Sequence, residues 1–329
     1  MGNNSAVSAS RVWPAFSSDE FLDTVRDVYM HGARKRVVEC EGIRVRTLVG
    51  ARNRAVSRFF PFPFMLEQVE PEFAATPVAV PMLYDVVVAE TRLREPGPPG
   101  AGISPFVRWS EFASWEEFLQ RSVSLPGIDS PQTVVRKTRR LERTLGTLDF
   151  QLVDDSADVF ETLLRWKSDQ YRRTGGVDRL SIRQNLDFYW EMRRRGLFSA
   201  TSLRAGGRLV AGKIGYRAGR RHIARLTVYD RDVGEFSPGA VAELMTLKAS
   251  YEAGDDEFDY QPGSQAYKFT HATHARWTVT LGKEPFPARV DRVVRARIGK
   301  ALRNRKAYIV YKEAVRRTAA HARTVRGRR

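Results

Sequence analysis

The sequence has very few of the residues that build disulfide frameworks and metal centres. It holds one cysteine, Cys40, and five histidines among 329 residues. A single cysteine excludes an intrachain disulfide and fits a reducing compartment. His271 and His274 are the one close histidine pair, and no zinc-ligand spacing surrounds them. We therefore expect no metal site and no bound cofactor.

Long hydrophobic runs are also missing from the sequence. The most apolar stretch, residues 76–89, is too short to span a bilayer and contains Pro77 and Pro81. The N-terminal segment MGNNSAVSASRVWPAF lacks the charged start and apolar run of a secretory signal. These absences predict a cytoplasmic protein without a transmembrane segment.

Positive charge, by contrast, is in excess and is unevenly distributed. The formal net charge is +17. Residues 289–329 hold fifteen Lys and Arg against two acidic residues, a balance of +13, so the other 288 residues carry only +4. Such a polycationic segment is typical of contact with RNA, DNA or an anionic membrane surface. A solvated basic helix is the plain alternative.

Periodicity and breaker residues divide the chain into four parts. Residues 1–17 are small, polar and without periodicity, which predicts disorder. Residues 18–125 and 126–288 each contain helices, tight turns and several strands, and residues 289–329 predict a basic helix. The order of elements favours an α/β fold (α+β, with a mixed sheet), in which two related domains precede a basic helical tail.

One stretch, residues 225–269, combines a strand, a helix and a polar turn. A β-branched and aromatic run ends at residues 229–230, and SPG at 237–239 has the residue types of a helix N-terminus. The segment FDY at 258–260 predicts a short strand, followed by the turn QPGSQAYKF. An open helix N-terminus beside strand ends suits an anion or a carbonyl group.

A basic helix that begins near residue 131 is a second candidate site. Its core reads RKTRRLERTLG. The cationic side chains could contact the phosphates of tRNA or of a phosphorylated substrate, because guanidinium groups are fork-shaped donors. A solvated basic face is the alternative. The predicted phosphate-binding residues are Arg136, Lys137, Arg139, Arg140 and Arg143.

Five segments of the second half share their order and spacing with a known family. They are RRLER at 139–143, AGGRLVAGKIGY at 205–216, YDRDVGEFSPG at 229–239, EFDYQPG at 257–263 and AYKF at 266–269. In this order, residues 130–282 resemble the cellulose-biosynthesis (CelD-like) branch of the GNAT acyltransferases, which is similar to the Fem peptidyltransferases. The resemblance implies tandem GNAT-like domains, with a degenerate first unit at 18–125 and the catalytic unit at 126–288.

The resemblance further implies acyl transfer to an amine or hydroxylamine-type acceptor. The donor is acyl-CoA or, in Fem-like enzymes, aminoacyl-tRNA. GNAT acetyltransferases carry a Gln/Arg-x-x-Gly-x-Gly/Ala loop that holds the CoA pyrophosphate, whereas the matching loop here is EFSPGAV. This departure and the basic tail favour aminoacyl-tRNA as donor and tRNA as partner, with acyl-CoA as the alternative. The predicted donor-binding residues are Tyr229, Asp230, Ser237 and Gly239.

Three residues near the last turn are the catalytic candidates. Fem-like enzymes carry a lysine at the position matching Lys268, which could stabilise the oxyanion or a neighbouring phosphate. Tyr267 could protonate the leaving oxygen or stack on adenine, and Asp259 could position the acceptor amine or act as a base. The alternatives are a surface lysine, a core tyrosine and a structural acid bonded to the turn. A non-catalytic RNA- or surface-binding protein is the third function that the sequence allows.

Overall fold

The computed structural model describes residues 14–50, 54–56, 64–78, 80–122, 128–175, 177–263 and 265–282, without the side chains of 54–56, 80–82 and 84. The chain divides into two compact units. One contains residues 1–168 and 179–282, and the other contains residues 169–178 and 283–329. The predicted basic tail at 289–329 therefore lies outside the described residues. Within the described residues, no helix has both the length and the apolar composition needed to cross a membrane.

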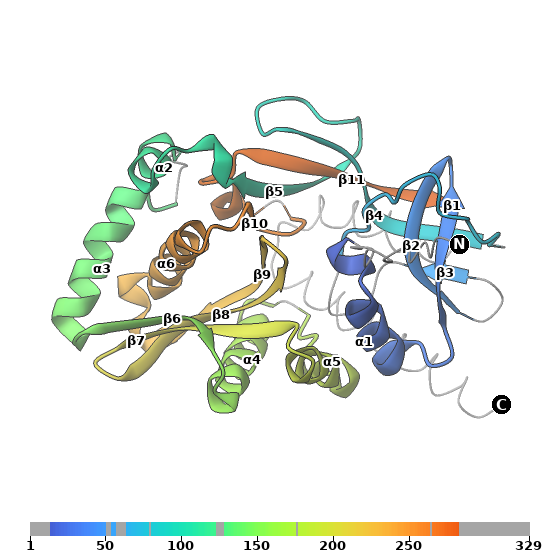
Figure 1. Cartoon of the computed structure of the whole chain (residues 1–329). Helices are drawn as coiled ribbons and strands as arrows, with labels where there is room; N and C mark the ends of the chain where they lie inside the picture. Colours follow the sequence, from blue (N-terminus) through green and yellow to red (C-terminus); the bar gives the residue numbers. More distant parts are fainter. Residues whose placement is uncertain are drawn as a thin grey trace, which may run out of the picture. The chain divides into compact units, whose positions relative to one another are not determined.

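One mixed sheet organises the first unit (Figure 1). Among the described residues it has eleven strands in the order β1-β2-β3-β4-β11-β5-β10-β9-β8-β7-β6. The β3–β4 and β10–β9 pairs are parallel and the other pairs are antiparallel. The strands are β1 (Arg34–Cys40), β2 (Ile43–Gly50), β3 (Arg54–Val56), β4 (Val80–Arg92), β5 (Gly102–Arg108), β6 (Leu148–Asp154), β7 (Phe198–Ala205), β8 (Arg208–Ala218), β9 (Arg221–Tyr229), β10 (Glu257–Asp259) and β11 (His274–Gly282). The predicted mixed α/β fold is confirmed.

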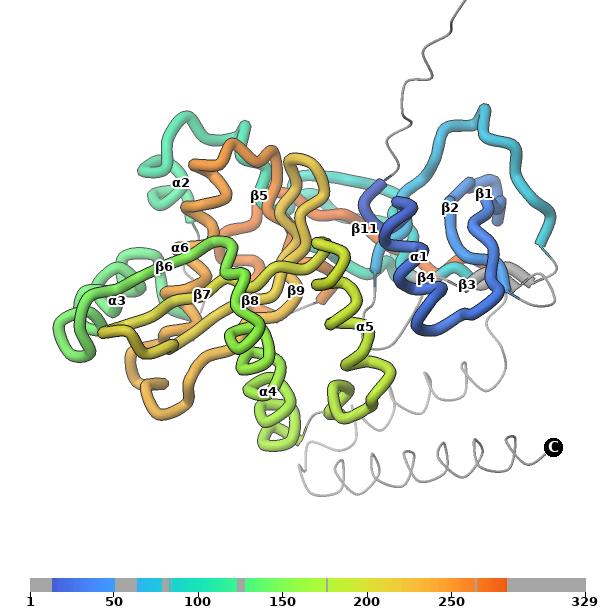
Figure 2. Tube along the Cα trace, turned by 60° about the horizontal axis from the view of Figure 1, so that its bottom comes forward, coloured from blue at the N-terminus to red at the C-terminus, as the bar shows by residue number. Residues whose placement is uncertain are grey.

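Helices cover both faces of the second half of this sheet. α4 and α5 lie on one face and α3 and α6 on the other (Figure 1), while α1 lies beside α5 (Figure 2). Serine side chains accept hydrogen bonds at the N-termini of α1, α2 and α3, where Ser18, Ser114 and Ser130 are the capping residues. The helical elements are η1 (Ala15–Ser17), α1 (Asp19–Tyr29), η3 (Trp109–Glu111), α2 (Trp115–Arg121), α3 (Pro131–Leu145), α4 (Ala157–Arg173), α5 (Arg183–Arg194), η4 (Arg231–Phe236), α6 (Pro238–Glu252) and η5 (Ala266–Phe269).

The end of the segment predicted to be disordered is ordered. Ala15–Ser17 form the 3-10 turn η1, and all three residues are buried. The ring of Phe16 packs edge-on against Phe21 at 5.2 Å between centroids. Burying such a ring stabilises the fold by about 2–3 kcal/mol, which offsets the entropy lost on ordering a short segment. Residues 1–13 lie outside the described residues.

The sheet passes without interruption from the first half of the chain to the second. β5 pairs with β10 in antiparallel orientation, and β11 pairs with both β4 and β5. β11 thus belongs to the segment predicted as the catalytic domain but lies between strands of the segment predicted as the first domain. The division at residues 125 and 126 stays a prediction, because strand pairing does not mark it.

The parallel strands β9 and β10 separate soon after they begin. They pair at only three positions, of which Asp259 opposite Ile223 is the last. β8 and β9 show a register shift that leaves Arg225 as an extra residue in β9. Such a bulge bends its strand and increases the local twist. β9 therefore continues away from β10, and the space between the two strands is open to side chains.

Candidate active site

A small cavity of about 50 Å³ lies where β9 and β10 separate. Its walls are residues 224–227 of β9, Glu243 of α6, residues 260–262 after β10, and residues 267–268 of η5. The structure thus brings two predicted catalytic residues, Tyr267 and Lys268, to one cavity. Asp259 and the predicted donor-binding residues are not part of its lining.

Lys268 presents a buried cation to this cavity. Its Nζ donates to the carbonyl oxygens of Gln261 at 3.0 Å and Pro262 at 3.1 Å. Because an ammonium has three hydrogens, one is left to contact a ligand. Burial lowers the pKa of Lys268 to about 8, with a further contribution from Arg225. The side chain is therefore mostly cationic at neutral pH, as stabilisation of an oxyanion requires.

Two more cationic side chains surround the same region. Lys167, on α4, donates from Nζ to the carbonyl oxygen of Thr227 at 3.5 Å. Burial, together with the charges of Arg225 and Lys268, lowers the pKa of Lys167 to about 8. Lys167 and Arg225 were not among the predicted site residues, because neither stands in a motif that matches a phosphate or oxyanion site.

Glu243 provides the carboxylate of the cavity. It lies on α6, and its Oε2 accepts from Nζ of Lys213 at 2.6 Å. Lys213, on β8, is 1% exposed and lies 4.8 Å from the centroid of the Phe258 ring. Among the described residues, neither Oε1 of Glu243 nor the Tyr260 hydroxyl makes a hydrogen bond of good geometry, although the two side chains interact: after burial, Glu243 contributes to raising the pKa of Tyr260. Unpaired buried carboxylate oxygens are rare, so Oε1 is a candidate contact for a ligand.

The Lys213–Glu243 pair was also not predicted, although each of the two residues stands out in the sequence as a lone charge. Glu243 is the one acid in the apolar stretch AVAELM, and Lys213 is the one charge in LVAGKIGY. A charged residue inside a buried element needs a partner or a function. The pairing itself depends on the tertiary structure, because it joins a strand to a helix thirty residues further along the chain.

Gln261 follows β10 by two residues and has a left-handed conformation, with φ of 63°. The residue is buried, and neither Oε1 nor Nε2 of its side chain has a hydrogen-bond partner among the described residues. Backbone strain in a non-glycine residue and an unpaired buried amide both occur preferentially at functional sites. Because Gln261 lines the cavity, its amide can bind a polar group of a ligand.

Asp259 is fully buried and is held by arginines of the neighbouring strands. Its Oδ2 lies 3.0 Å from Arg221 on β9 and 3.3 Å from Arg276 on β11. Its Oδ1 accepts from the backbone N–H of Gln261 at 2.7 Å. These contacts match the structural role that the sequence left open for this acid. They fix the position of the turn that carries Gln261 and, through its carbonyl oxygen, Lys268.

The N-terminus of α6 joins the two sites that were predicted separately. Ser237 occupies the N-cap position with φ of 51°, but its side chain makes no capping bond. Instead its Oγ accepts from Nζ of Lys137 on α3 at 2.8 Å, and the same Nζ contacts Asp129 at 2.6 Å. Arg140 of α3 pairs with Glu235 at 2.9 Å. The basic helix and the helix N-terminus therefore form one surface.

The remaining predicted residues are spread around this surface. The half-exposed ring of Tyr229 lies against Gly239, where an added Cβ would come within 3.0 Å of the ring. Asp230 pairs with Arg208 at 2.5 Å and caps η4. The other three predicted phosphate-binding residues are exposed on α3: Arg136, Arg139 and Arg143.

Comparison with known proteins gives one sequence match. Residues 131–269 match the family described as acetyltransferase (GNAT) domain. No curated protein matches the chain significantly. The match does not distinguish the CelD-like branch from the rest of the GNAT families.

Solved structures are similar at low identity. FemX is 9% identical, with 80% of this chain and 92% of that chain covered and a TM-score of 0.49. L-PGS from Bacillus licheniformis is 12% identical, with 88% of this chain and 98% of that chain covered and a TM-score of 0.43. A tandem GNAT protein from the clavulanic acid biosynthesis pathway is 11% identical, with 84% of this chain and 92% of that chain covered and a TM-score of 0.40. At these scores the likeness supports no functional conclusion.

The matched residues contain every element that builds the cavity. They run from the start of α3 to the end of η5, and they include β9, α6 and β10 between them. The part of the chain that matches the acetyltransferase (GNAT) domain therefore contains the whole lining of the cavity, and the protein is an acyltransferase.

Proposed function

We propose that the protein transfers an aminoacyl group from aminoacyl-tRNA to the amine of a small acceptor, in the cavity between β9 and β10. One observation carries the proposal. The cavity holds a buried carboxylate oxygen, Oε1 of Glu243, that makes no hydrogen bond of good geometry with any described residue, in the same lining as the buried ammonium of Lys268. An aminoacyl ester has a group for each, because its α-ammonium is a donor and its carbonyl becomes an oxyanion.

The free oxygen of Glu243 favours an aminoacyl group over a plain acyl group. The α-ammonium of the donor would give Oε1 a charge-assisted hydrogen bond. An acetyl group in the same place would offer Oε1 no charged donor, so this contact, worth about 1.5–3 kcal/mol, would be absent. The small volume of the cavity, about 50 Å³, further favours an amino acid with a short side chain.

Lys268 and Tyr267 have complementary roles in this reaction. The acceptor nitrogen attacks the ester carbon, and the third hydrogen of the Lys268 ammonium bonds the developing oxyanion. A single preorganised donor of this kind contributes about 10²–10³-fold to the rate. The C–O bond to the ribose then breaks. Tyr267 gives its proton to the leaving oxygen and receives one from the new amide nitrogen, which balances the transfer.

The surface formed by α3 and the N-terminus of α6 suits the phosphates of the donor. Lys137, Arg140 and the N-terminus of the helix supply positive charge there. Glu243 lies six residues after Ser237, which is about 9 Å along a helix. One donor can therefore reach both places. The half-exposed ring of Tyr229, packed on Gly239, offers a face on which a base can stack.

Acyl-CoA is the second candidate donor, and the match to a GNAT acetyltransferase domain favours it. In that reaction Oε1 of Glu243 would accept the proton of the attacking amine instead of binding an ammonium. The two donors thus assign different steps to the same carboxylate.

A donor-discharge assay decides between these candidates. The protein is incubated with a radiolabelled aminoacyl-tRNA pool or with labelled acetyl-CoA, together with amine acceptors, and label transferred to the acceptor is measured. We expect transfer from aminoacyl-tRNA that RNase abolishes. Activity that survives RNase, or transfer from acetyl-CoA alone, would overturn the aminoacyl assignment.

The Glu243→Gln variant adds a second distinction to this assay. With aminoacyl-tRNA, loss of the carboxylate raises KM for the donor, because the α-ammonium loses its partner. With acetyl-CoA, the same change lowers kcat by about 10²-fold or more and leaves KM for the donor unchanged, because it removes a base.

A further inference from the structure

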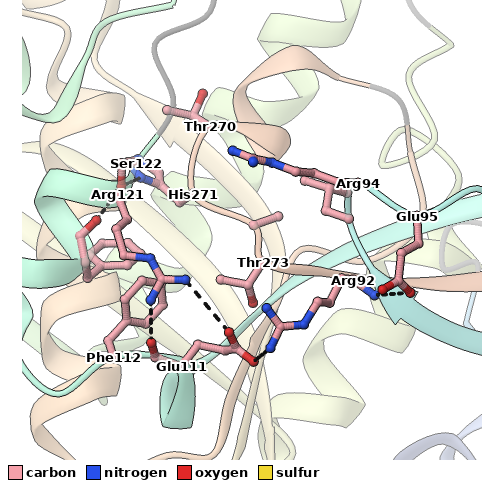
Figure 3. A pocket seen from close by; sticks show the side chains of 13 residues that line it. Arg92, Arg94, Glu95, Glu111, Phe112, Arg121, Ser122, Thr270, His271 and Thr273 are labelled. Atoms are coloured by element: carbon pink, nitrogen blue, oxygen red, sulfur yellow. Dashed lines mark hydrogen bonds and ion pairs between the residues drawn. The ribbon is translucent and has the colours of Figure 1, made fainter.

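A second and larger cavity, of about 470 Å³, lies beside the segment that follows η5 (Figure 3). Its walls come from the connection between β4 and β5, from η3 and α2, and from residues 270–273. The volume is typical of a small-molecule site. No step of the transfer reaction described above uses this cavity.

The charged side chains of this cavity leave one net positive charge. Three guanidinium groups, on Arg92, Arg94 and Arg121, face two carboxylates, on Glu95 and Glu111. Arg92 pairs with Oε1 of Glu111 at 2.9 Å, and Arg121 donates to the carbonyl oxygen of Glu111 at 2.7 Å. Two of the three arginines are thus engaged with Glu111.

Arg94 is the cation that remains available. No described residue forms an ion pair or hydrogen bond with its guanidinium group. Figure 3 shows this side chain reaching across the cavity toward Thr270 and His271. Arginine presents a planar fork that fits a carboxylate with two parallel hydrogen bonds.

The wall opposite Arg94 carries a hydroxyl group that lacks a partner. Thr270 is buried, and its Oγ1 makes no hydrogen bond among the described residues. Beside it, Nδ1 of His271 lies 3.0 Å from Oγ of Ser122, which itself donates to Phe118. Nδ1 is therefore the donor, and burial lowers the pKa of His271 to about 4, so the ring is neutral at physiological pH.

The two cavities share one short segment of the chain. Lys268 lines the reaction cavity, and Thr270 lines the larger one. Two residues span at most about 7 Å between Cα atoms. A small molecule in the larger cavity thus lies near the group that is to react with the acyl donor.

We propose that the larger cavity binds the carboxylate group of the amine acceptor, so that the acceptor is an amino-acid-like molecule. The carboxylate pairs with Arg94 and accepts a hydrogen bond from the Thr270 hydroxyl. A singly charged anion matches the net charge of the lining, whereas a phosphate dianion would be repelled by Glu95 and Glu111. That the bound molecule is the acceptor rests on the function proposed above. The binding of a carboxylate in this cavity does not depend on that function.

Matched small probes test this proposal by isothermal titration calorimetry on the full chain. β-Alanine carries both an amine and a carboxylate, propionate only the carboxylate, and propylamine only the amine. Inorganic phosphate is the fourth probe. We expect β-alanine and propionate to bind with Kd of about 1 mM, and propylamine not to bind. Tighter binding of phosphate than of propionate, or no binding of either carboxylate, would overturn the proposal.

Two variants and a control locate the binding. Arg94→Gln should weaken the binding of propionate at least about tenfold, because the variant loses a bidentate charged contact. Thr270→Val should weaken the binding of propionate severalfold. It should leave the stability of the free protein unchanged, because the hydroxyl makes no hydrogen bond with any described residue. Arg183→Gln, whose side chain is 87% exposed on α5, should change nothing. Unchanged binding in Arg94→Gln would place the carboxylate elsewhere and refute the assignment.

A third variant separates this proposal from the proposed function. Lys268→Arg should bind propionate like the wild type even though it transfers acyl groups slowly. If carboxylates bind here but no donor is discharged, the cavity assignment stands and the proposed function fails. If amines without a carboxylate are acylated as fast as β-alanine, the proposed function stands and the assignment of this cavity fails.

Discussion

At the scale of single residues, burial is what sets the chemistry of Lys268. A lysine in water has a pKa near 10.4, whereas this one is lowered to about 8 because the protein replaces its hydration shell. It therefore loses its charge close to physiological pH. The charge matters for the reaction, since the ammonium is the group that contacts the oxyanion.

The pH dependence of the reaction should report this pKa. We expect kcat of the wild type to fall as pH rises through about 8, because the cation is lost above that value. Lys268→Arg keeps its charge in this range, so its lower kcat should not show the decline. The measurement is a kcat profile from pH 6 to pH 10. A decline that persists in the variant would assign the titration to Lys167, whose pKa also lies at about 8.

Asp259 allows a second test at the residue scale. Its carboxylate is 0% exposed and lies between Arg221 and Arg276. Asp259→Asn therefore removes a negative charge that balances these two guanidinium groups. We expect the free energy of unfolding to fall by about 3 kcal/mol, as measured by urea denaturation. Asp256→Asn is the matched control, since that side chain is 65% exposed, and it should change stability by less than about 0.5 kcal/mol. Unaltered stability together with a fall in kcat of about 10²-fold or more would instead make Asp259 a base.

At the scale of elements, the separation of β9 from β10 creates the site. A regular parallel pair would close this space with backbone hydrogen bonds. The bulge at Arg225 bends β9, and the left-handed Gln261 turns the chain after β10. The turn then returns Lys268 to the gap, where α6 adds Glu243. None of these elements forms the site alone.

The contact between α3 and α6 should govern affinity for the donor. Lys137→Met removes the ammonium at the N-terminus of α6, so we expect KM for the donor to rise about tenfold with kcat unchanged. Lys248→Met is the control, because that residue lies near the other end of α6 and is 52% exposed. Steady-state kinetics with varied donor provide the measurement. An equal effect of both substitutions would indicate a general loss of positive charge.

At the scale of the whole molecule, the continuous sheet and the uneven charge have separate consequences. Strands from both halves of the chain alternate at its centre, where β11 and β10 flank β5. Arginines and acids on these strands link the halves, as in the contact of Arg221 with Glu67 at 2.5 Å. The basic segment at 289–329, which lies outside the described residues, carries +13 of the net charge of +17.

If tRNA is the donor, that basic segment should set the salt dependence of binding. Replacing Arg323, Arg326, Arg328 and Arg329 by Gln should reduce the slope of log K against log salt by up to about 3, since each phosphate contact contributes about 0.7–0.9. Filter binding at several salt concentrations measures the slope. The value of kcat at saturating donor should not change. A slope equal to that of the wild type would mean that the segment does not contact RNA.

The sequence by itself determined the class of fold. Strand and helix signals and the order of motifs are local features, and they predicted the mixed sheet and named Tyr267 and Lys268, which both line the small cavity. Only the tertiary structure decided which residues share the cavity. Lys167, Lys213, Arg225 and Glu243 come from four different elements, and their proximity depends on a bulge and a turn that no local pattern fixes. The tertiary structure likewise decided that Asp259 lies between two arginines, because burial and charge pairing depend on neighbouring strands that are distant in the chain.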